Sequence, residues 1–138
     1  MADFSITGGC QCGAVRYRVT APANELSHCH CSICRRIHGA VFASFAIVSP
    51  EHFIVEQGAE GLQRYDSSPG AQRYFCSRCG SHIYGDVETL PDMRFYTVGS
   101  LDGGAHPGHA PENESHIYVG SKIPWWHITD NLPQTEES

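Results

Sequence analysis

Hydrophobic and polar residues alternate along much of this chain, and a period of two residues is typical of half-exposed β-strands. The clearest alternation is AVRYRVT at residues 14–20. Residues 40–48, AVFASFAIV, are apolar at almost every position, which favours a central strand buried on both faces. Residues 62–66 and 72–75 flank SSPG, whose proline and glycine predict the turn of a hairpin.

The other predicted elements are short. Further strands are expected up to Gly9 and at residues 26–31, 52–55, 81–84, 94–98 and 116–119. Residues 34–38 favour a short helical turn, and the glycine- and proline-rich residues 103–111 favour a loop. The pattern therefore predicts a mainly β protein with short helical turns only.

Length and charge limit the class of protein. The chain has 138 residues, 41% of them hydrophobic, so we expect residues 1–138 to form a single domain, with the polar residues 134–138 as a frayed tail. No run approaches the ~18 apolar residues of a membrane span. Nine Lys and Arg against 15 Asp and Glu give a formal charge of −6, which argues against nucleic acid as a partner because such binding needs a basic face. The oligomeric state stays open.

The chain contains seven cysteines, and their number and setting favour metal binding over disulfides. The first residues, MADFSITGG, have neither the basic start nor the apolar core of a signal peptide. We therefore expect a cytoplasmic protein, and in that reducing compartment clustered cysteines more often bind metal or do redox chemistry. The odd number of thiols and the strain of a C-x-C bridge point the same way.

Four of the cysteines make two pairs that add up to one complete site. Cys10 and Cys12 form a C-x-C pair, and Cys76 and Cys79 a C-x-x-C pair followed by Gly80, which permits the positive φ of a metal knuckle. Four thiolates are the usual ligand set of structural zinc. Because Cys12 and Cys76 lie 64 residues apart, a shared ion would close a long loop and stabilise the fold by about 4 kcal/mol.

The remaining cysteines, Cys29, Cys31 and Cys34 in CHCSICRR, can supply three ligands to a second ion from one short segment. These three cysteines close almost no loop of the chain, so a metal bound by them adds little stability. Three protein ligands and an open fourth position are the arrangement typical of a catalytic zinc site. The alternative is that a histidine completes this site and both ions are structural. The histidines considered for that role are His28, His30, His38, His82 and His116.

Four segments resemble, in order, the glutathione-dependent formaldehyde-activating enzyme family, which also includes centromere protein V. They are GGCQCGAVRY, CHCSICRRIHGA, RYDSSPG with FCSRCGS, and HIYVGSKIPWWHITDNLP, and together they run from about Gly8 to Pro133. The resemblance implies a β-tent fold of several small antiparallel sheets, two zinc ions and carbon–sulfur lyase activity. In the founding enzyme, formaldehyde condenses with glutathione to S-hydroxymethylglutathione. The resemblance also implies structural zinc on Cys10, Cys12, Cys76 and Cys79, and catalytic zinc on Cys29, Cys31 and Cys34.

Two Zn²⁺ ions per chain are the expected cofactors, although an iron–sulfur cluster uses a comparable cysteine framework and stays open as an alternative. Zinc on three thiolates is suited to a soft fourth ligand such as a substrate thiol, which it would ionise. The product of addition to an aldehyde is a hemithioacetal, whose oxygen needs an acid or base. His38 and His116 are the candidates.

Other residues near the triplet have two interpretations each. Arg35 and Arg36 suit a substrate carboxylate, or they offset the charge of the thiolates. Trp125 and Trp126 are expected to fill core or pocket wall.

Two functions from different classes remain. The first is a zinc-dependent carbon–sulfur lyase that acts on the thiol adduct of a small aldehyde or related electrophile, with a small-molecule thiol, glutathione among them, as partner. The alternative is a zinc-stabilised binding module without catalytic activity. An open second site beside a pocket favours the enzyme, and a fourth protein ligand there favours the module.

Overall fold

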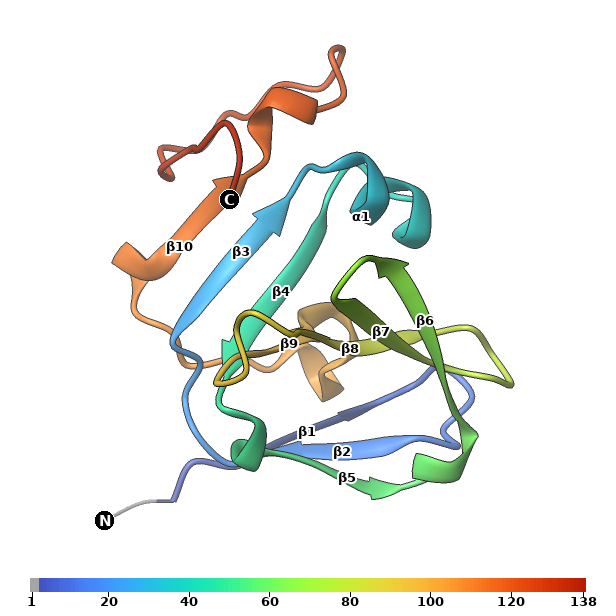
Figure 1. Ribbon diagram of the computed structural model, residues 1–138. Helices are drawn as coiled ribbons and strands as arrows, with labels where there is room; N and C mark the ends of the chain where they lie inside the picture. Colours follow the sequence, from blue (N-terminus) through green and yellow to red (C-terminus); the bar gives the residue numbers. More distant parts are fainter. Residues whose placement is uncertain (1–2) are drawn as a thin grey trace.

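A computed structural model describes residues 3–138; Met1 and Ala2, which the predicted domain includes, lie outside the described residues. Within residues 3–138, ten strands form a three-stranded and a seven-stranded sheet (Figure 1). The strands are β1 (Ile6–Gly9), β2 (Arg16–Val19), β3 (Glu25–Cys29), β4 (Ala43–Val48), β5 (Phe53–Gln57), β6 (Leu62–Ser68), β7 (Ala71–Cys76), β8 (His82–Val87), β9 (Arg94–Thr97) and β10 (Glu114–Ile117). The helical pieces are the α-helix α1 (Ser32–His38) and the 3₁₀ turns η1 (Pro50–His52), η2 (Ala59–Gly61), η3 (Val98–Ser100), η4 (Asp102–Gly104), η5 (Pro111–Asn113) and η6 (Val119–Ser121).

The smaller sheet has the order β1-β2-β5, with antiparallel pairing throughout. Its central strand β2 alternates as the sequence predicts, because Tyr17 and Val19 are fully buried while Arg16 and Arg18 are half-exposed. The Tyr17 hydroxyl lies 2.6 Å from the hydroxyl of Ser100. This bond satisfies a polar group that would otherwise be costly to bury.

The larger sheet has the order β10-β3-β4-β9-β8-β7-β6. β10 runs parallel to β3, and the other pairings are antiparallel. β4 lies between β3 and β9, as expected for the apolar run at residues 40–48, although the strand begins only at Ala43. β6 and β7 form the predicted hairpin, with Gly70 at positive φ in its turn.

Aromatic rings join the two sheets through one core. Tyr17 of β2 and Phe53 of β5 stack with their centroids 4.7 Å apart, and Tyr96 of β9 lies 5.7 Å from Phe53. Cys10 and Cys76 belong to the same buried cluster. The first pair of cysteine motifs is therefore attached to the centre of the protein.

α1 begins directly after the extended end of β3. Cys31 is its N-cap, with φ −64° and ψ 154°, and the Cys31 sulfur accepts the backbone N–H of Cys34 at 3.3 Å. The helix ends at Gly39, which has the left-handed φ of 57° that glycine adopts most easily. The predicted helical turn is present, and these two caps place the cysteine triplet at a strand-to-helix junction.

The C-terminal segment differs from the frayed tail that the sequence suggests. The backbone N–H of Thr135 donates to the carbonyl of His116, and those of Tyr118 and Val119 donate to the carbonyls of Glu137 and Thr135. β10 is an edge strand, so its outer backbone groups need partners, and the C-terminal segment supplies them. Val119 lies in η6 and not in the predicted strand.

The mainly β prediction with short helical pieces is confirmed. The sheets are fewer and larger than the several small antiparallel ones expected, and the larger sheet is mixed. Among the described residues, no helix has the length and apolar character needed to cross a membrane.

Candidate metal centres

The fold brings together the same cysteines that the spacing grouped. In one group the sulfurs of four residues all lie within 4.8 Å of one another, and in the other group the sulfurs of three residues do so. The four-sulfur group contains Cys10, Cys12, Cys76 and Cys79, and the three-sulfur group contains Cys29, Cys31 and Cys34. Each group could hold one metal ion.

The four-sulfur group joins the end of β1 to the knuckle between β7 and β8. The Cys12 sulfur lies 3.6 Å from that of Cys10 and 3.8 Å from that of Cys76. Gly80 has φ 80°, and its N–H donates to the carbonyl of Cys76 at 2.8 Å. The glycine after the C-x-x-C pair therefore closes a tight turn that most other residues would strain.

Hydrogen-bond donors face this group and favour thiolates. The backbone N–H of Val15 donates to the Cys10 sulfur at 3.2 Å, and the Ser81 hydroxyl lies 3.2 Å from the Cys79 sulfur. The Ser81 contact lowers the pKa of Cys79 to about 5. Four converging sulfurs with donors around them match the ligand set of a structural zinc.

The three-sulfur group lies where β3 meets α1. Cys29 and Cys34 are buried, Cys31 is partly exposed, and Ala43 of β4 packs against them. A residue distant in sequence completes the surroundings: Arg73 of β7 donates from Nη2 to the Cys34 sulfur at 3.3 Å. The guanidinium therefore places a positive charge beside the cluster.

The pKa values of the triplet diverge because its thiols share protons. Hydrogen bonds from Cys29 and Cys34 lower the pKa of Cys31 to about 2, and the Cys31 sulfur in turn raises the pKa of Cys29. The three sulfurs lie so close together that negative charge on one opposes the ionisation of the others. Only a bound cation would let all three sulfurs ionise together, so the donor set fits a thiophilic metal ion.

Within residues 3–138, no fourth protein ligand joins the triplet. Among the described residues, no histidine nitrogen, carboxylate oxygen or further sulfur lies within 4.8 Å of all three sulfurs. The histidines considered for this position have other neighbours. His28 lies 2.7 Å from Ser44 Oγ, His30 lies 2.8 Å from His116, and the ring of His38 lies 5.1 Å from that of His82.

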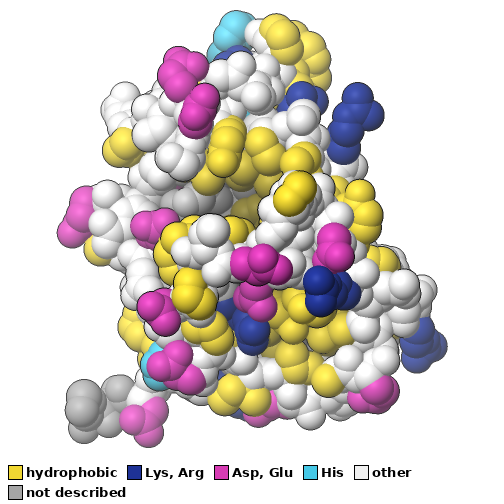
Figure 2. Space-filling model, viewed as in Figure 1, with side chains coloured by type: hydrophobic (Ala, Val, Ile, Leu, Met, Phe, Trp, Pro, Cys, Tyr) yellow, Lys and Arg dark blue, Asp and Glu magenta, His cyan; other side chains and the backbone are white. Residues whose placement is uncertain are grey.

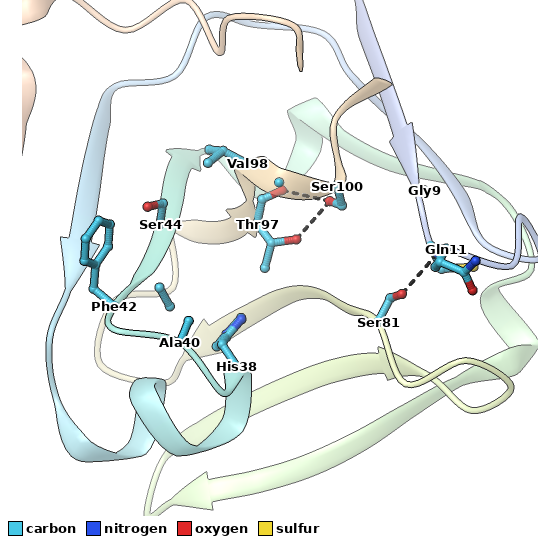
Figure 3. Close-up of a pocket in the computed structure, with 13 residues that line it drawn as sticks. Gly9, Gln11, His38, Ala40, Phe42, Ser44, Ser81, Thr97, Val98 and Ser100 are labelled. Carbon is cyan, nitrogen blue, oxygen red and sulfur yellow. Dashed lines mark hydrogen bonds between the residues drawn. The ribbon is translucent and has the colours of Figure 1, made fainter. Parts of the chain in front are cut away.

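A cavity of about 630 Å³ lies between the two cysteine groups. Cys10 of the first group lines it, and so does Ala43, which packs on Cys29 and Cys34 of the second. Figure 3 shows His38 at this pocket, with Thr97 and Ser100 across from it. The face seen in Figure 2 is hollowed where Figure 1 places the upper end of β4 and α1.

His38 is the titratable side chain that lines this cavity besides Cys10. Its Nε2 is buried and has no hydrogen-bond partner among residues 3–138. Burial lowers the pKa of His38 to about 4, and the nearby ring of His82 acts in the same direction. His38 is therefore a neutral imidazole at pH 7, with a ring nitrogen free for a ligand.

His116, the other predicted acid or base, lies elsewhere. Its Nδ1 is 2.8 Å from Nε2 of His30, and its Nε2 is 3.0 Å from a carboxylate oxygen of Asp130. The side chain is buried, and it pairs in register with His28, whose neighbour Cys29 points to the other side of β3. Both ring nitrogens have partners, and His116 does not line the cavity that contains His38, so a role of His116 as acid or base stays a prediction.

Sequence analysis does not indicate that Arg73 lies beside the triplet. Arg73 lies 39 residues after Cys34, and only the pairing of β7 with β6 and β8 brings it to the cluster. Its one sequence signal is its place in a hairpin strand. Trp125 was expected in core or pocket wall; it is 71% exposed and lines a small pocket beside α1, so it belongs to a pocket wall and not to the core.

Two sheets around paired cysteine groups, one with four sulfurs and one with three, define a class of mainly β proteins with two potential metal sites. The chain belongs to the glutathione-dependent formaldehyde-activating enzyme family, whose model matches residues 5–121.

Known relatives agree with this assignment. A Halomonas elongata protein that bears the family's name is 30% identical over 89% of this chain and 80% of its own length. A Fusarium vanettenii protein of the same name is 36% identical over 63% of this chain but only 48% of its own length. The chain thus spans about half of that fungal relative. A Rhodobacter sphaeroides crystal structure is 30% identical with a TM-score of 0.62, over 71% of this chain and 89% of that one.

Proposed function

We propose that this protein is a cytoplasmic, zinc-dependent carbon–sulfur lyase that forms or cleaves the adduct of a small-molecule thiol with formaldehyde or a related small aldehyde. Membership of the family supports the reaction class. Two Zn²⁺ ions per chain would be bound, a structural ion by Cys10, Cys12, Cys76 and Cys79, and a second ion by Cys29, Cys31 and Cys34.

One observation carries the proposal: the second cysteine group has three sulfurs and no fourth protein ligand among the described residues. A purely structural site is normally closed by four protein ligands, as the first group would be. A position left to solvent or substrate is the mark of a catalytic zinc site. The cavity is lined by Ala43, which packs on Cys29 and Cys34, so a small ligand in it would be separated from these cysteines by one residue.

When bound at the triplet, zinc would supply a soft Lewis acid that favours the ionised form of a substrate thiol. The side chains around it serve the rest of the reaction. Arg73 donates to the Cys34 sulfur and partly offsets the negative charge of three thiolates. Cys29 and Cys34 are buried, so their sulfurs are shielded from water and held in place.

His38 is the group that would move the proton of the aldehyde oxygen. As a carbon–sulfur bond forms between a thiolate and a carbonyl carbon, the oxygen gains negative charge and needs a proton; in cleavage the hemithioacetal hydroxyl gives that proton up. The unpartnered Nε2 of His38 lines the cavity where this oxygen would lie. In synthesis a neutral imidazole can take up the proton that the thiol releases and pass it to the oxygen, and in cleavage it can carry the hydroxyl proton back to the departing sulfur.

The test is the rate of exchange between formaldehyde, glutathione and S-hydroxymethylglutathione, followed by NMR above the uncatalysed background. The zinc-loaded protein should accelerate exchange, and Cys31→Ser should abolish the acceleration while the protein stays folded. An exposed-residue control, His127→Asn, should match the wild type. A zinc-loaded wild type that accelerates no thiol–aldehyde pair would instead identify a binding module without catalytic activity.

A further inference from the structure

The strand β6 lies at one end of the larger sheet, and its outer edge is open. Among residues 3–138, β6 pairs with β7 and with no other strand, and Figure 1 shows it at the outside of the sheet. At the opposite end of the sheet, the C-terminal segment covers the edge of β10. β6 has seven residues and contains no proline. An edge of this length can accept a further strand unless charge or shape prevents the pairing.

The register of the β6–β7 hairpin shows which backbone groups point to the open edge. The N–H of Ser77 donates to the carbonyl of Gly61 at 2.9 Å, and β6 continues this register as far as Asp66. Hydrogen-bonded pairs alternate along an antiparallel ladder, so the odd-numbered residues bond to β7 up to Tyr65. The even-numbered residues turn their backbone groups outwards; they are Leu62, Arg64 and Asp66.

Two of these outward-facing residues keep their backbone groups free within residues 3–138. The N–H of Leu62 donates to the carbonyl of Ala59 at the end of η2. The backbone groups of Arg64 and Asp66 point away from β7, and no other strand of the described chain pairs with them. They offer two donors and two acceptors to a strand that approaches from outside.

The side chains at this edge are complementary to a second copy of themselves. Arg64 and Asp66 lie on the same face of β6, with Nε and Oδ1 2.7 Å apart, and their side chains are 55% and 63% exposed. A second β6 that runs antiparallel about Tyr65 places Arg64 of each copy opposite Asp66 of the other. Opposite charges directly across a strand pair stabilise it. In the same register, the open backbone groups of Arg64 and Asp66 exchange hydrogen bonds with those of the second copy.

Tyr65 occupies the centre of this pairing, on the other face of the strand. Its side chain is 52% exposed. Across the two-fold axis the two copies of Tyr65 form a non-hydrogen-bonded pair, in which side chains lie closest together and aromatic rings stabilise the contact. Arg73 lies directly opposite Tyr65 in β7 and donates to the Cys34 sulfur. A second copy would therefore extend the face of the sheet that carries Arg73.

We propose that β6 is a dimerisation strand, through which two copies of this chain pair antiparallel about Tyr65 and join their larger sheets into one. The partner is a second copy because Arg64-Tyr65-Asp66 is complementary to its own reverse, so one two-fold contact satisfies both charges twice. Chains of net charge −6 repel one another in general. Two paired strands bury less than the roughly 1,200–2,000 Å² of a standard interface, so we expect a dimer that dissociates on dilution.

Sedimentation of the zinc-loaded protein in reducing buffer, from low micromolar to near-millimolar concentration, tests the pairing. Asp66→Arg places arginines opposite each other and should raise the dissociation constant of the dimer at least about tenfold. Arg64→Asp combined with Asp66→Arg puts opposite charges back across the axis and should restore the dimer. Asp92→Arg makes the same charge change at an exposed site between β8 and β9, and it should dimerise as the wild type does.

Amide hydrogen exchange in the wild type locates the contact without any variant. The N–H groups of Arg64 and Asp66 should exchange more slowly as the protein concentration rises, whereas that of Tyr65, bonded to β7, should be protected throughout. A wild type that stays monomeric, or exchange at Arg64 and Asp66 that does not depend on concentration, would overturn the proposal and leave the edge to a foreign strand. A dimer that survives Asp66→Arg, or a folded double variant that remains monomeric, would overturn it as well.

Discussion

At the scale of single residues, His38 has the least ordinary setting of the side chains at the cavity. A buried imidazole without a partner resists protonation, because the charged form loses its water and gains no compensating bond. The pKa of His38 is accordingly lowered from 6.5 to about 4. The burial that suits His38 for proton transfer therefore also lowers the stability of the folded protein in acid.

Acid should destabilise the fold partly through His38. The unfolded chain protonates this residue near pH 6.5 and the folded protein only near pH 4, so unfolding takes up a proton between these values. Its contribution is present above pH 6.5 and is lost as the pH falls towards 4. Urea unfolding of His38→Asn at several pH values should therefore show a shallower loss of stability in this window than the wild type. His127→Asn, at an exposed site, should follow the wild type, and a His38→Asn profile as steep as that of the wild type would contradict the assignment.

His38→Asn should also slow thiol–aldehyde exchange if the ring moves the proton of the oxygen. General acid–base groups contribute roughly 10²–10⁴-fold in rate. We expect a loss in this range in kcat with little change in KM, measured by the same NMR exchange assay. His116→Asn is not a clean control because its buried partners would be left unpaired, so His127→Asn serves again. A His38→Asn protein with wild-type kcat would remove His38 from the mechanism.

Site residues could be identified from sequence where a cysteine motif marks them, both within the triplet and between the two distant pairs. The spacing of Cys29, Cys31 and Cys34 indicates one site by itself, since a strand end and one helical turn bring them together. Arg73 and the pairing of His30 with His116 could not be foreseen, because both depend on strand register. In the sequence, several histidines are equally good candidates for the acid or base. Only the fold shows that His38 lines the cavity, whereas His116 pairs with His30 and Asp130.

At the scale of elements, the two cysteine groups should differ in their effect on stability. The four-sulfur group ties β1 to the β7–β8 knuckle across 64 residues, whereas the triplet links one strand end to the next helix. Cys12→Ser, at an exposed position, should lower the free energy of unfolding of the zinc-loaded protein by about 4 kcal/mol. Cys31→Ser should leave a folded protein close to wild-type stability. Thermal and urea melts in the reverse order would refute this division of roles.

The turn before η2 provides a test of how closely the backbone packs at the end of the β2–β5 pair. Gly58 has φ 82°, and a Cβ there would lie 2.1 Å from the carbonyl oxygen of Ala14. Gly58→Ala should therefore cost about 1–3 kcal/mol of stability. Gly61→Ala is the matched control, because its φ is not positive and nothing lies within 4 Å of its Cβ; it should change stability by less than about 0.5 kcal/mol. Equal melts for the two variants would contradict the backbone described here.

Elements were predictable where a local pattern decides them. Alternation in β2, the apolar run in β4 and the Pro-Gly turn of the β6–β7 hairpin each identify their own strand. The parallel pairing of β10 with β3 and the docking of the C-terminal segment are long-range contacts that no local pattern encodes. The polar residues 134–138 suggest a frayed tail in the sequence. Only the fold shows that they pair with the edge strand β10, whose outer backbone groups need partners.

At the scale of the whole molecule, the two cysteine groups are the organising feature. The four-sulfur group lies against the core between the sheets, and the three-sulfur group packs on Ala43, which lines the cavity that contains His38. The mainly β class follows from sequence pattern, but the cavity between the groups does not, because it arises from how two sheets meet.

The most direct test of the central claim is a crystal structure of the zinc-loaded protein, with anomalous diffraction at the zinc edge to locate and count the ions. We predict two zinc ions per chain, each sulfur about 2.3 Å from its metal. At Cys29, Cys31 and Cys34 the fourth neighbour should be water, a buffer molecule or a thiol. A histidine or other protein ligand in that position, a single ion shared by all seven sulfurs, or iron in place of zinc would contradict the account.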